Sequence, residues 1–433
     1  MTDVLDNATD LEPVDDFRER ARVFLKENVP PASEMRGAQG FLASGTEEEE
    51  LDDVQRNRDL QRLFYDGGFA GICFPKEYDG QGLSVDHQVA FNEELTGYSY
   101  SQRIQVPTFQ PCASVLLDFG TEEQKKEHFP KIFKGEEIWM QLLSEPSGGS
   151  DVAGAQTSAV RDGDEWVING SKIWTTGAWW SDWGLALIRT NWDVPKHRGL
   201  SVFIFPLHQD GIEIHQIEMV NGAKEFCQEF ITDLRIPDSQ RVGEVDDGWT
   251  IGIRWMFYER NLGGRSPFLT RPAGATRGGG AAGAREPMLT LARRAGKIDD
   301  PRTRELVGEA HALGHVGRSL TSRVAGLMMS GKVSDQAAAL GRLMGGTTAV
   351  RTSTISYEIA GASAGVWDGD DADEQALGNV GSSYLSRQAS CIAGGTTEMA
   401  RNVVSERVLG MPRERTMDKD VPFKDVPKGP PSH

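Results

Sequence analysis

The chain of 433 residues is long enough for two or three domains with an ample core. Its net charge of −18, with no basic tail or stripe, argues against nucleic acid or an anionic membrane as a partner, although a few local Arg or Lys residues can still hold an anionic ligand. The longest apolar run, near residues 200–207, is too short to span a bilayer.

The cysteines carry no zinc or redox signature. Cys73, Cys112, Cys227 and Cys391 are far apart in the chain, which favours reduced, buried thiols in a cytoplasmic protein. Residues 1–16 are acidic and lack an apolar core, so we expect no signal peptide.

Residues 16–135 have a helical pattern. Phe17, Ala21, Phe24 and Leu25 recur at helical spacing, as apolar residues do again at 60–64. The acidic run at 47–50 opens a helix or lies on a solvated face.

Strand signals dominate residues 136–243. Alternating or β-branched runs occur at residues 166–168, 184–188, 201–205 and 212–217. Residues 157–176 contain three such runs joined by turns, at 162–164 and at Asn169-Gly170, which predicts an antiparallel meander.

A polar loop precedes this meander. Pro146, Gly148, Gly149 and Ser150 give a backbone poor in side chains, whose N–H groups can face a planar or phosphorylated ligand. An ordinary surface loop is the alternative, since Gly/Ser loops are common.

The chain is helical again from Gly248, through residues 302–329, 335–359 and 396–409. His311 and His315 have the i, i+4 spacing of a helical metal site, but no third ligand joins them, so we interpret them as surface or packing residues and expect no metal.

Two segments do not fit the helical pattern. Residues 271–285 are too glycine-rich for a helix and are interpreted as a mobile loop, an insertion rather than a lid. The proline-rich segment after residue 416 is expected not to fold on its own. The order of elements predicts an α+β fold with an N-terminal helical domain (1–135), a middle antiparallel β-sheet domain (136–245), a C-terminal helical bundle (246–415) and a tail (416–433).

Five sets of segments, in order along the chain, resemble signatures of the acyl-CoA dehydrogenase family, although Asp79 stands where a glycine is usual. They are residues 67–84; residues 120–125 with 129–132; residues 141–151 with 174–176; residues 230–237 with 243–249; and residues 394–398 with Arg401-Asn402 and 409–412.

The resemblance implies an FAD enzyme that converts an acyl-CoA thioester to a trans-2-enoyl-CoA. A carboxylate takes the α-proton while the β-hydrogen leaves as hydride to flavin N5. The implied partners are the acyl-CoA substrate, an electron-transfer flavoprotein as electron acceptor, and either like subunits in a dimer or tetramer or a related subunit in a heterotetramer.

The position of the base separates branches of the family. Many members carry a Glu where this chain has Gly394, which has no side chain. Others, similar to the isovaleryl-CoA, long-chain and actinobacterial enzymes, carry it on the long C-terminal helix before an arginine, and Glu259-Arg260 matches that pattern. The resemblance therefore implies Glu259 as the catalytic base, while the N–H of Gly394 still helps to polarise the thioester carbonyl.

Helix geometry gives independent support for Glu259. Its helical neighbours Trp255, Met256, Leu262 and Gly263 cannot pair with it, so we expect an apolar surrounding that raises its pKa toward the range of a general base. The alternative is a glutamate held by an arginine such as Arg254 or by a residue on another helix.

The resemblance also implies binding roles for other residues. Ser144 is the best-defined donor to the flavin pyrimidine, Trp174 shields the ring face and Thr176 reaches N5, whereas Ser150 touches the phosphopantetheine arm. The full implied set is Gln141, Leu142, Leu143, Ser144, Trp174, Thr175, Thr176, Thr396 and Glu398 for FAD, and Ser150, Arg260, Gly394 and Gly395 for the substrate.

Two FAD-binding sequences of many relatives are missing. Neither Arg-x-x-Phe-Gly nor Gln-x-x-Gly-Gly-x-Gly occurs in the C-terminal part, where residues 361–364 form the nearest small-residue loop. This departure leaves a catalytically silent supporting subunit of a heteromeric dehydrogenase as one alternative. A flavin monooxygenase or oxidase on the same fold is another, although Glu259 argues against it. By analogy with the branch, steroid side-chain, branched or aryl-acyl thioesters are the expected substrates.

Overall fold

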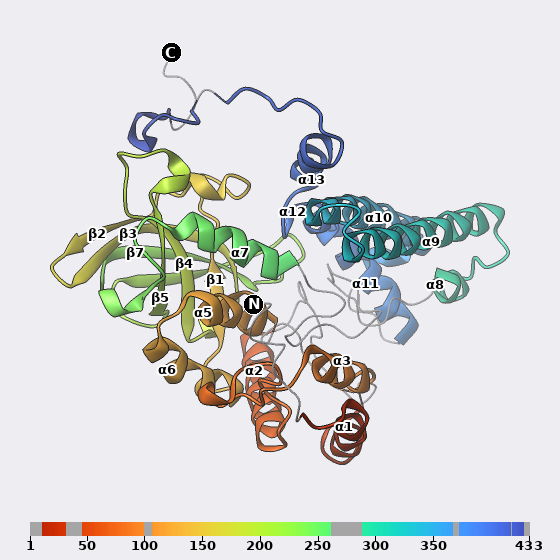
Figure 1. Ribbon diagram of the computed structural model, residues 1–433. Coiled ribbons are helices and arrows are strands. Elements are labelled where there is room, and N and C mark those ends of the chain that lie inside the picture. Colours follow the sequence, from red (N-terminus) through yellow and green to blue (C-terminus); the bar gives the residue numbers. More distant parts are fainter. Residues whose placement is uncertain are drawn as a thin grey trace.

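The computed structural model describes residues 11–31, 46–98, 106–260, 288–366, 372–416 and 418–427, so the predicted loop at 271–285 lies outside the described residues. Helices come first, then strands, then helices again, which confirms the predicted α+β fold (Figure 1). Within the described ranges, no helix is both long and apolar enough to cross a membrane.

The N-terminal helices form around aromatic side chains. Phe17, Ala21 and Leu25 are buried as their spacing predicts, and Phe69 and Phe91 stack at 5.2 Å beside them. Thr46 begins its helix with a capping box, so the acidic run at 47–50 does open a helix, where its charge favours the N-terminus. The helices are α1 (Val14–Asn28), α2 (Glu47–Asp66), α3 (Val85–Glu94), α5 (Ser114–Phe119) and α6 (Glu122–Phe133).

Asp79 explains why a glycine is usual at its position. Its φ is +71°, the left-handed region that asparagine and aspartate tolerate better than other side chains. Tyr65 donates a hydrogen bond of 2.7 Å from its hydroxyl to the Asp79 carboxylate, which gives this aspartate a structural role.

The strands form one sheet with the order β6-β7-β3-β2-β4-β5-β8, and β1 lies beside β4. Most pairs are antiparallel, as expected, but β1 and β2 run parallel to β4. The strands are β1 (Trp139–Leu142), β2 (Ser158–Asp162), β3 (Glu165–Thr176), β4 (Trp183–Arg189), β5 (Leu200–Pro206), β6 (Ile212–Ile217), β7 (Phe226–Pro237) and β8 (Arg241–Val242).

The predicted hairpin turn at Asn169-Gly170 is wrong. The chain continues through it as the single strand β3, which pairs with β2 over residues 165–169 and with β7 along its whole length. The Asn169 side chain bonds Asp233 on β7 twice, at 2.9 and 3.0 Å, where β7 carries an irregularity, and Gly170 lets Thr157 approach so closely that a Cβ would lie 2.6 Å from it. The Asn-Gly pair thus serves a bulge and a close strand contact instead of a turn.

Strands β4 and β5 are buried on both faces. One face joins the core of the N-terminal helices through Leu185, Leu187 and Val202. The other joins a second core inside the folded sheet, with Ala186 and Phe203. Burial on both sides explains why these strands appear in the sequence as continuous apolar runs.

Helix α7 (Gly248–Arg260) belongs to the first core rather than to the remaining C-terminal helices. Its Ile251, Trp255 and Tyr258 are buried there. The others build a separate core around Leu306, Ile355 and other apolar residues. They are α8 (Met288–Arg294), α9 (Pro301–Met329), α10 (Ala338–Ala360), α11 (Ala372–Ser386), α12 (Ala389–Ile392) and α13 (Thr397–Val403). The domain limits at 135 and 245 stay predictions.

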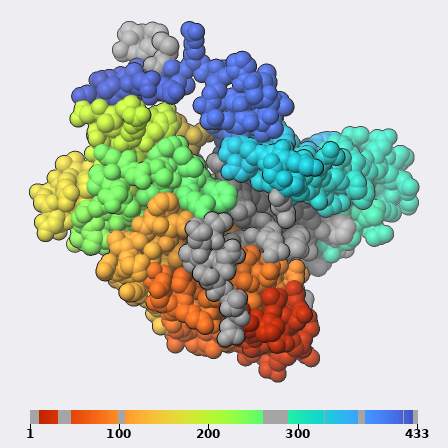
Figure 2. Space-filling model, viewed as in Figure 1, coloured from red at the N-terminus to blue at the C-terminus, as the bar shows by residue number. Residues whose placement is uncertain are grey.

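The tail does not behave as an unfolded arm. The chain leads away from α13 through residues 409–416, and residues 418–427 lie beside the sheet region, as Figures 1 and 2 show. The backbone N–H groups of Phe423 and Lys424 donate to the carbonyls of Val194 and Trp192 at 2.9 and 3.0 Å. Phe423 is 4% exposed and covers the Arg189 guanidinium at 3.9 Å. One buried aromatic residue therefore anchors this proline-rich segment to another part of the chain.

Candidate active site

Two predicted flavin segments meet at the ends of β1 and β3. The Ile173 N–H donates to the carbonyl of Ser144 at 3.0 Å, so Gln141 to Ser144 and Trp174 to Thr176 lie side by side. Leu142 is fully buried, whereas Gln141, Leu143 and Ser144 are half-buried and retain exposed surface. The two segments, about thirty residues apart in the chain, thus form one surface.

Trp174 is an extra residue in the β3–β7 ladder. Ile173 pairs with Gln228 and Thr175 with Cys227, which leaves Trp174 without a partner at a bulge. Its φ is +65°, an outlier for a bulky side chain, and it is 51% exposed. Phe226 supports the indole edge-on at 5.9 Å. The bulge turns a large flat ring outward, while Thr175 points into the sheet.

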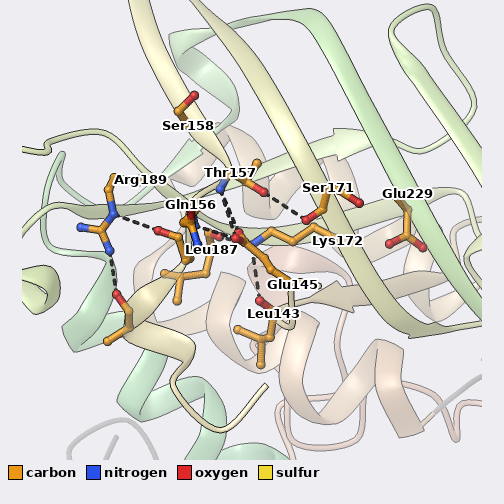
Figure 3. Close-up of polar contacts among 12 residues, drawn as sticks. Leu143, Glu145, Gln156, Thr157, Ser158, Ser171, Lys172, Leu187, Arg189 and Glu229 are labelled. Atoms are coloured by element: carbon orange, nitrogen blue, oxygen red, sulfur yellow. Dashed lines mark hydrogen bonds and ion pairs between the residues drawn. The ribbon is translucent and has the colours of Figure 1, made fainter. Parts of the chain in front are cut away.

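A buried ion pair lies behind this surface (Figure 3). Lys172 and Glu145 are both nearly inaccessible and meet at 2.8 Å. Lys172 also donates to the carbonyls of Leu143 and Leu187, and Glu145 accepts the N–H groups of Gln156 and Thr157. These bonds fix the backbone on both sides of Ser144 from within.

The electrostatics of this pair follow from burial and mutual attraction. Burial opposes ionisation of Glu145, but the Lys172 ammonium and the N–H groups outweigh it and hold the pKa of Glu145 below its usual value. Burial lowers the pKa of Lys172. Burial also lowers the pKa of Arg189 to about 10, while its guanidinium donates to the carbonyls of Ala153 and Ala155 just after the Ser150 loop.

Helix α7 reaches the flavin surface through a tryptophan. The Trp255 Nε1–H donates to Gln141 Oε1 at 2.7 Å. Glu259 lies one turn further along the same face and is half-buried, less enclosed than its apolar neighbours predict. Arg254, the alternative partner, forms an ion pair with Asp118 at 3.0 Å. Leu262, Gly263 and the Arg260 side chain lie outside the described residues.

The Gly394-Gly395 turn is held by Arg342 of α10. The guanidinium donates to the carbonyls of Ser390, Ala393 and Gly395 at 2.8, 2.9 and 2.8 Å. Both glycines have positive φ, +68° and +97°, so the turn needs glycine for its conformation. A carboxylate-bearing residue at position 394 would be strained there.

The residues after this turn begin α13. Thr396 caps the helix by accepting the Met399 N–H at 3.0 Å, and Glu398 lies exposed in its first turn. Backbone hydrogen bonding lowers the pKa of Glu398. Across the described residues, the hydrogen bonds of 394–398 run within this segment and to α10, not to β1 or β3. The structure does not itself join this part of the predicted site to Trp174.

Ser150 is exposed in the loop between Ser144 and β2. Glu145 and Gly148 exchange backbone hydrogen bonds that close the turn before it, and Asp151 pairs with Lys196 at 3.0 Å. His311 and His315 are exposed on α9, and no group of three metal-ligating side chains is found in the described part of the chain.

Sequence reasoning missed the buried polar residues Glu145, Lys172 and Glu229. For Lys172, the sequence signal is the alternation of side chains between the two faces of β3. Trp166, Ile168 and Lys172 fall on the same, buried face of β3, so a lysine at that spacing requires a buried partner. The pattern was obscured by the supposed turn at Asn169-Gly170.

Known proteins resemble most of the chain. Three family models match in order: "Acyl-CoA dehydrogenase, N-terminal domain" over residues 12–136, "Acyl-CoA dehydrogenase, middle domain" over 141–233 and "Acyl-CoA dehydrogenase, C-terminal domain" over 271–409. The acyl-CoA dehydrogenase IpdE1 of Mycobacterium tuberculosis is 32% identical over 409 residues, which cover 93% of this chain and 99% of the relative.

Other relatives and solved structures agree. Cyclohexane-1-carbonyl-CoA dehydrogenase of Syntrophus aciditrophicus is 26% identical, covering 70% of this chain and 78% of that enzyme. The structure titled Tcur3481-Tcur3483 steroid ACAD matches with a TM-score of 0.70 at 26% identity, covering 93% of this chain and 99% of that one. The ChsE4-ChsE5 complex of Mycobacterium tuberculosis, at 24% identity and a TM-score of 0.67, covers 94% and 100% and supports the fold. The chain belongs to the acyl-CoA dehydrogenase family of flavoprotein oxidoreductases.

Proposed function

We propose that the protein catalyses FAD-dependent α,β-dehydrogenation of an acyl-CoA thioester to a trans-2-enoyl-CoA, with Glu259 as the base. The observation that carries this proposal is the 2.7 Å bond from Trp255 to Gln141, which fastens the helix of Glu259 to the strand assigned to the flavin. This hydrogen bond supports the proposal that the base on α7 and the flavin surface on β1 and β3 belong to one site.

The residues at this surface fit FAD. A half-exposed indole, turned out at a bulge, offers a face for an isoalloxazine ring, and the half-buried Ser144 is the proposed donor to its pyrimidine side. Thr176 is the proposed contact of N5, and Thr396 and Glu398 those of the diphosphate or adenosine part. When bound, FAD supplies the acceptor for the hydride that leaves the β-carbon.

The chain's own residues divide the remaining chemistry. Glu259 removes the α-proton onto a carboxylate oxygen as the α-C–H bond breaks. The Gly394 N–H is proposed to donate to the thioester oxygen, where negative charge develops. Ser150 and Arg260 are proposed to hold the CoA arm. The positive φ of Gly394 supports a separation of roles, since that turn favours a residue without a side chain.

The substrate is proposed to be a bulky or branched acyl-CoA, such as a steroid-derived or alicyclic thioester. Support comes from relatives whose names specify a steroid or a cyclohexane-carbonyl group. An electron-transfer flavoprotein is the proposed electron acceptor.

The Glu259→Gln variant tests the base. We expect it to bind FAD like the wild type but to lose reduction of the flavin by acyl-CoA, with rates at least about 10³-fold lower, because proton removal by a positioned base typically contributes two to four orders of magnitude. Flavin bleaching near 450 nm in anaerobic stopped-flow, across a series of acyl-CoA thioesters, is the measurement. Glu244→Gln, an exposed carboxylate just before α7, is the matched control and should bleach normally.

A silent supporting subunit is the second candidate, favoured by Gly394 and by similarity to two-component complexes. It predicts a colourless chain that stays colourless with added FAD. Retained bleaching in Glu259→Gln would instead overturn the assignment of the base.

A further inference from the structure

Glu229 is a fully buried carboxyl that the proposed reaction does not use. It lies on β7 inside the folded sheet and is 0% exposed. Its Oε2 accepts the Thr175 hydroxyl at 2.9 Å, and its Oε1 has no hydrogen-bond partner in the described structure. A buried carboxylate with one oxygen left without a partner is poorly compensated, so the neutral acid is favoured.

The charged groups near Glu229 do not reverse this preference for the neutral acid. Lys172 stands opposite Glu229 in the ladder, but its three N–H groups go to Glu145, Leu143 and Leu187 (Figure 3). On β7 itself, Cys227 shares the buried face, and Glu225, just before the strand, is also buried. On β6, Glu213 and His215 are exposed, and the contact of His215 with the ring of Phe230 places them on the opposite face.

Thr175 links Glu229 to the proposed flavin surface. It stands between Trp174 and Thr176, and it is the first paired residue after the bulge. A neutral Glu229 can donate its O–H to the Thr175 oxygen, whereas an ionised one can only accept, so the direction of the bond depends on one proton. Any change at Thr175 moves the residues on either side of it.

We propose that Glu229 is a positioning residue, which acts through Thr175 to set the placement of Trp174 and Thr176 according to its protonation. It does not touch the reacting atoms. The inference rests on the proposed function for the role of Trp174 and Thr176, but the coupling of Glu229 to this segment stands on the geometry alone.

The pH window follows from the direction of the shift. Burial raises the pKa of Glu229 to about 8 from its ordinary 4.5. Because the folded form holds the proton more tightly than the unfolded form, its contribution to stability is complete below about pH 4.5 and is lost as the pH rises toward 8. The segment should therefore loosen in the range in which Glu229 ionises.

Hydrogen–deuterium exchange of the peptide 173–178 in the full chain tests the coupling without relying on activity. After correction for intrinsic rates, we expect protection in the wild type to fall about tenfold across a one-proton step, the effect of losing one charge-sensitive hydrogen bond. The step should be centred near pH 8. Glu229→Gln, which is isosteric and cannot ionise, should stay at the low-pH level, and Thr175→Val should abolish the step. Glu213→Gln, on the exposed face, should leave it unchanged.

The same variants are then titrated with FAD. We expect the wild-type flavin spectrum and FAD affinity to follow the exchange step, and those of Glu229→Gln to be independent of pH. An unchanged step in Glu229→Gln, or no step in the wild type, overturns the inference. A wild-type chain that shows the exchange step but binds no FAD overturns the proposed function and leaves the coupling of Glu229 to Thr175 intact.

Discussion

The middle sheet and the C-terminal helices differ in how completely they bury themselves. Strands β4 and β5 are covered on both faces, and the sheet encloses even charged side chains such as Lys172. In α9, by contrast, the buried residues among those described are Thr303, Leu306, Ala310 and Val324. Val316 is 53% exposed on this helix. The sheet therefore completes its own core, whereas the described C-terminal helices leave apolar side chains such as Val316 exposed.

The largest expected effect is in the sheet. Lys172→Met removes the partner of a buried carboxylate, and we expect a loss of about 3–5 kcal/mol in the free energy of unfolding. Denaturant unfolding monitored by fluorescence measures it. The double variant Lys172→Met/Glu145→Gln, which removes both charges, should recover much of this loss. A single variant as stable as the wild type would show that the pair does not support the sheet.

In the helices, Ile355→Ala tests a smaller core. Ile355 is fully buried, so a loss of about 2–4 kcal/mol is expected from cavity formation. If a partner completes these helices, the thermal midpoint of wild type and variant should rise with protein concentration, because association stabilises the folded state. A midpoint independent of concentration, with a monomeric mass in solution, would remove the contrast between the two regions.

The tail gives the smallest effect. Phe423→Ala should cost about 1–2 kcal/mol, since the tail can undock without unfolding the sheet. Limited proteolysis should cut near residues 418–427 much faster in the variant. Lys419→Ala, an exposed lysine of the same segment, is the control. Equal cleavage rates in all three proteins would mean that the Phe423 contact does not hold the tail.

The local sequence pattern predicted most helices and strands. The segments that it did not predict depend on contacts with residues distant in the chain. Strand β6 was expected at its observed limits because apolar and polar residues alternate over 212–215 and Ile217 is β-branched. The turn predicted at Asn169-Gly170 does not form because Asn169 bonds Asp233, which is too distant in the sequence for a local pattern to include. The docking of the tail also depends on a distant partner, since Phe423 lies on Arg189.

For the candidate site, the sequence motifs identified the proposed flavin surface but not the contacts that hold it in place. The meeting of residues 141–144 with 174–176 follows from the resemblance, and the structure bears out their proximity. The link from Trp255 to Gln141 and the buried Glu229 required coordinates, because each joins strands or helices distant in sequence. The role of Glu259 stays a prediction.

The pairing of β3 with β7 does not explain why Trp174 is present. The β3–β7 ladder runs from Ile173 to Thr175 as though nothing stood between them, so removing Trp174 would leave every other pair in register. Keeping a bulky side chain at positive φ costs about 1–3 kcal/mol. Folding alone would favour the shorter strand, and a chain with this residue deleted should still fold. The chain therefore retains the Trp174 ring although its backbone conformation destabilises β3.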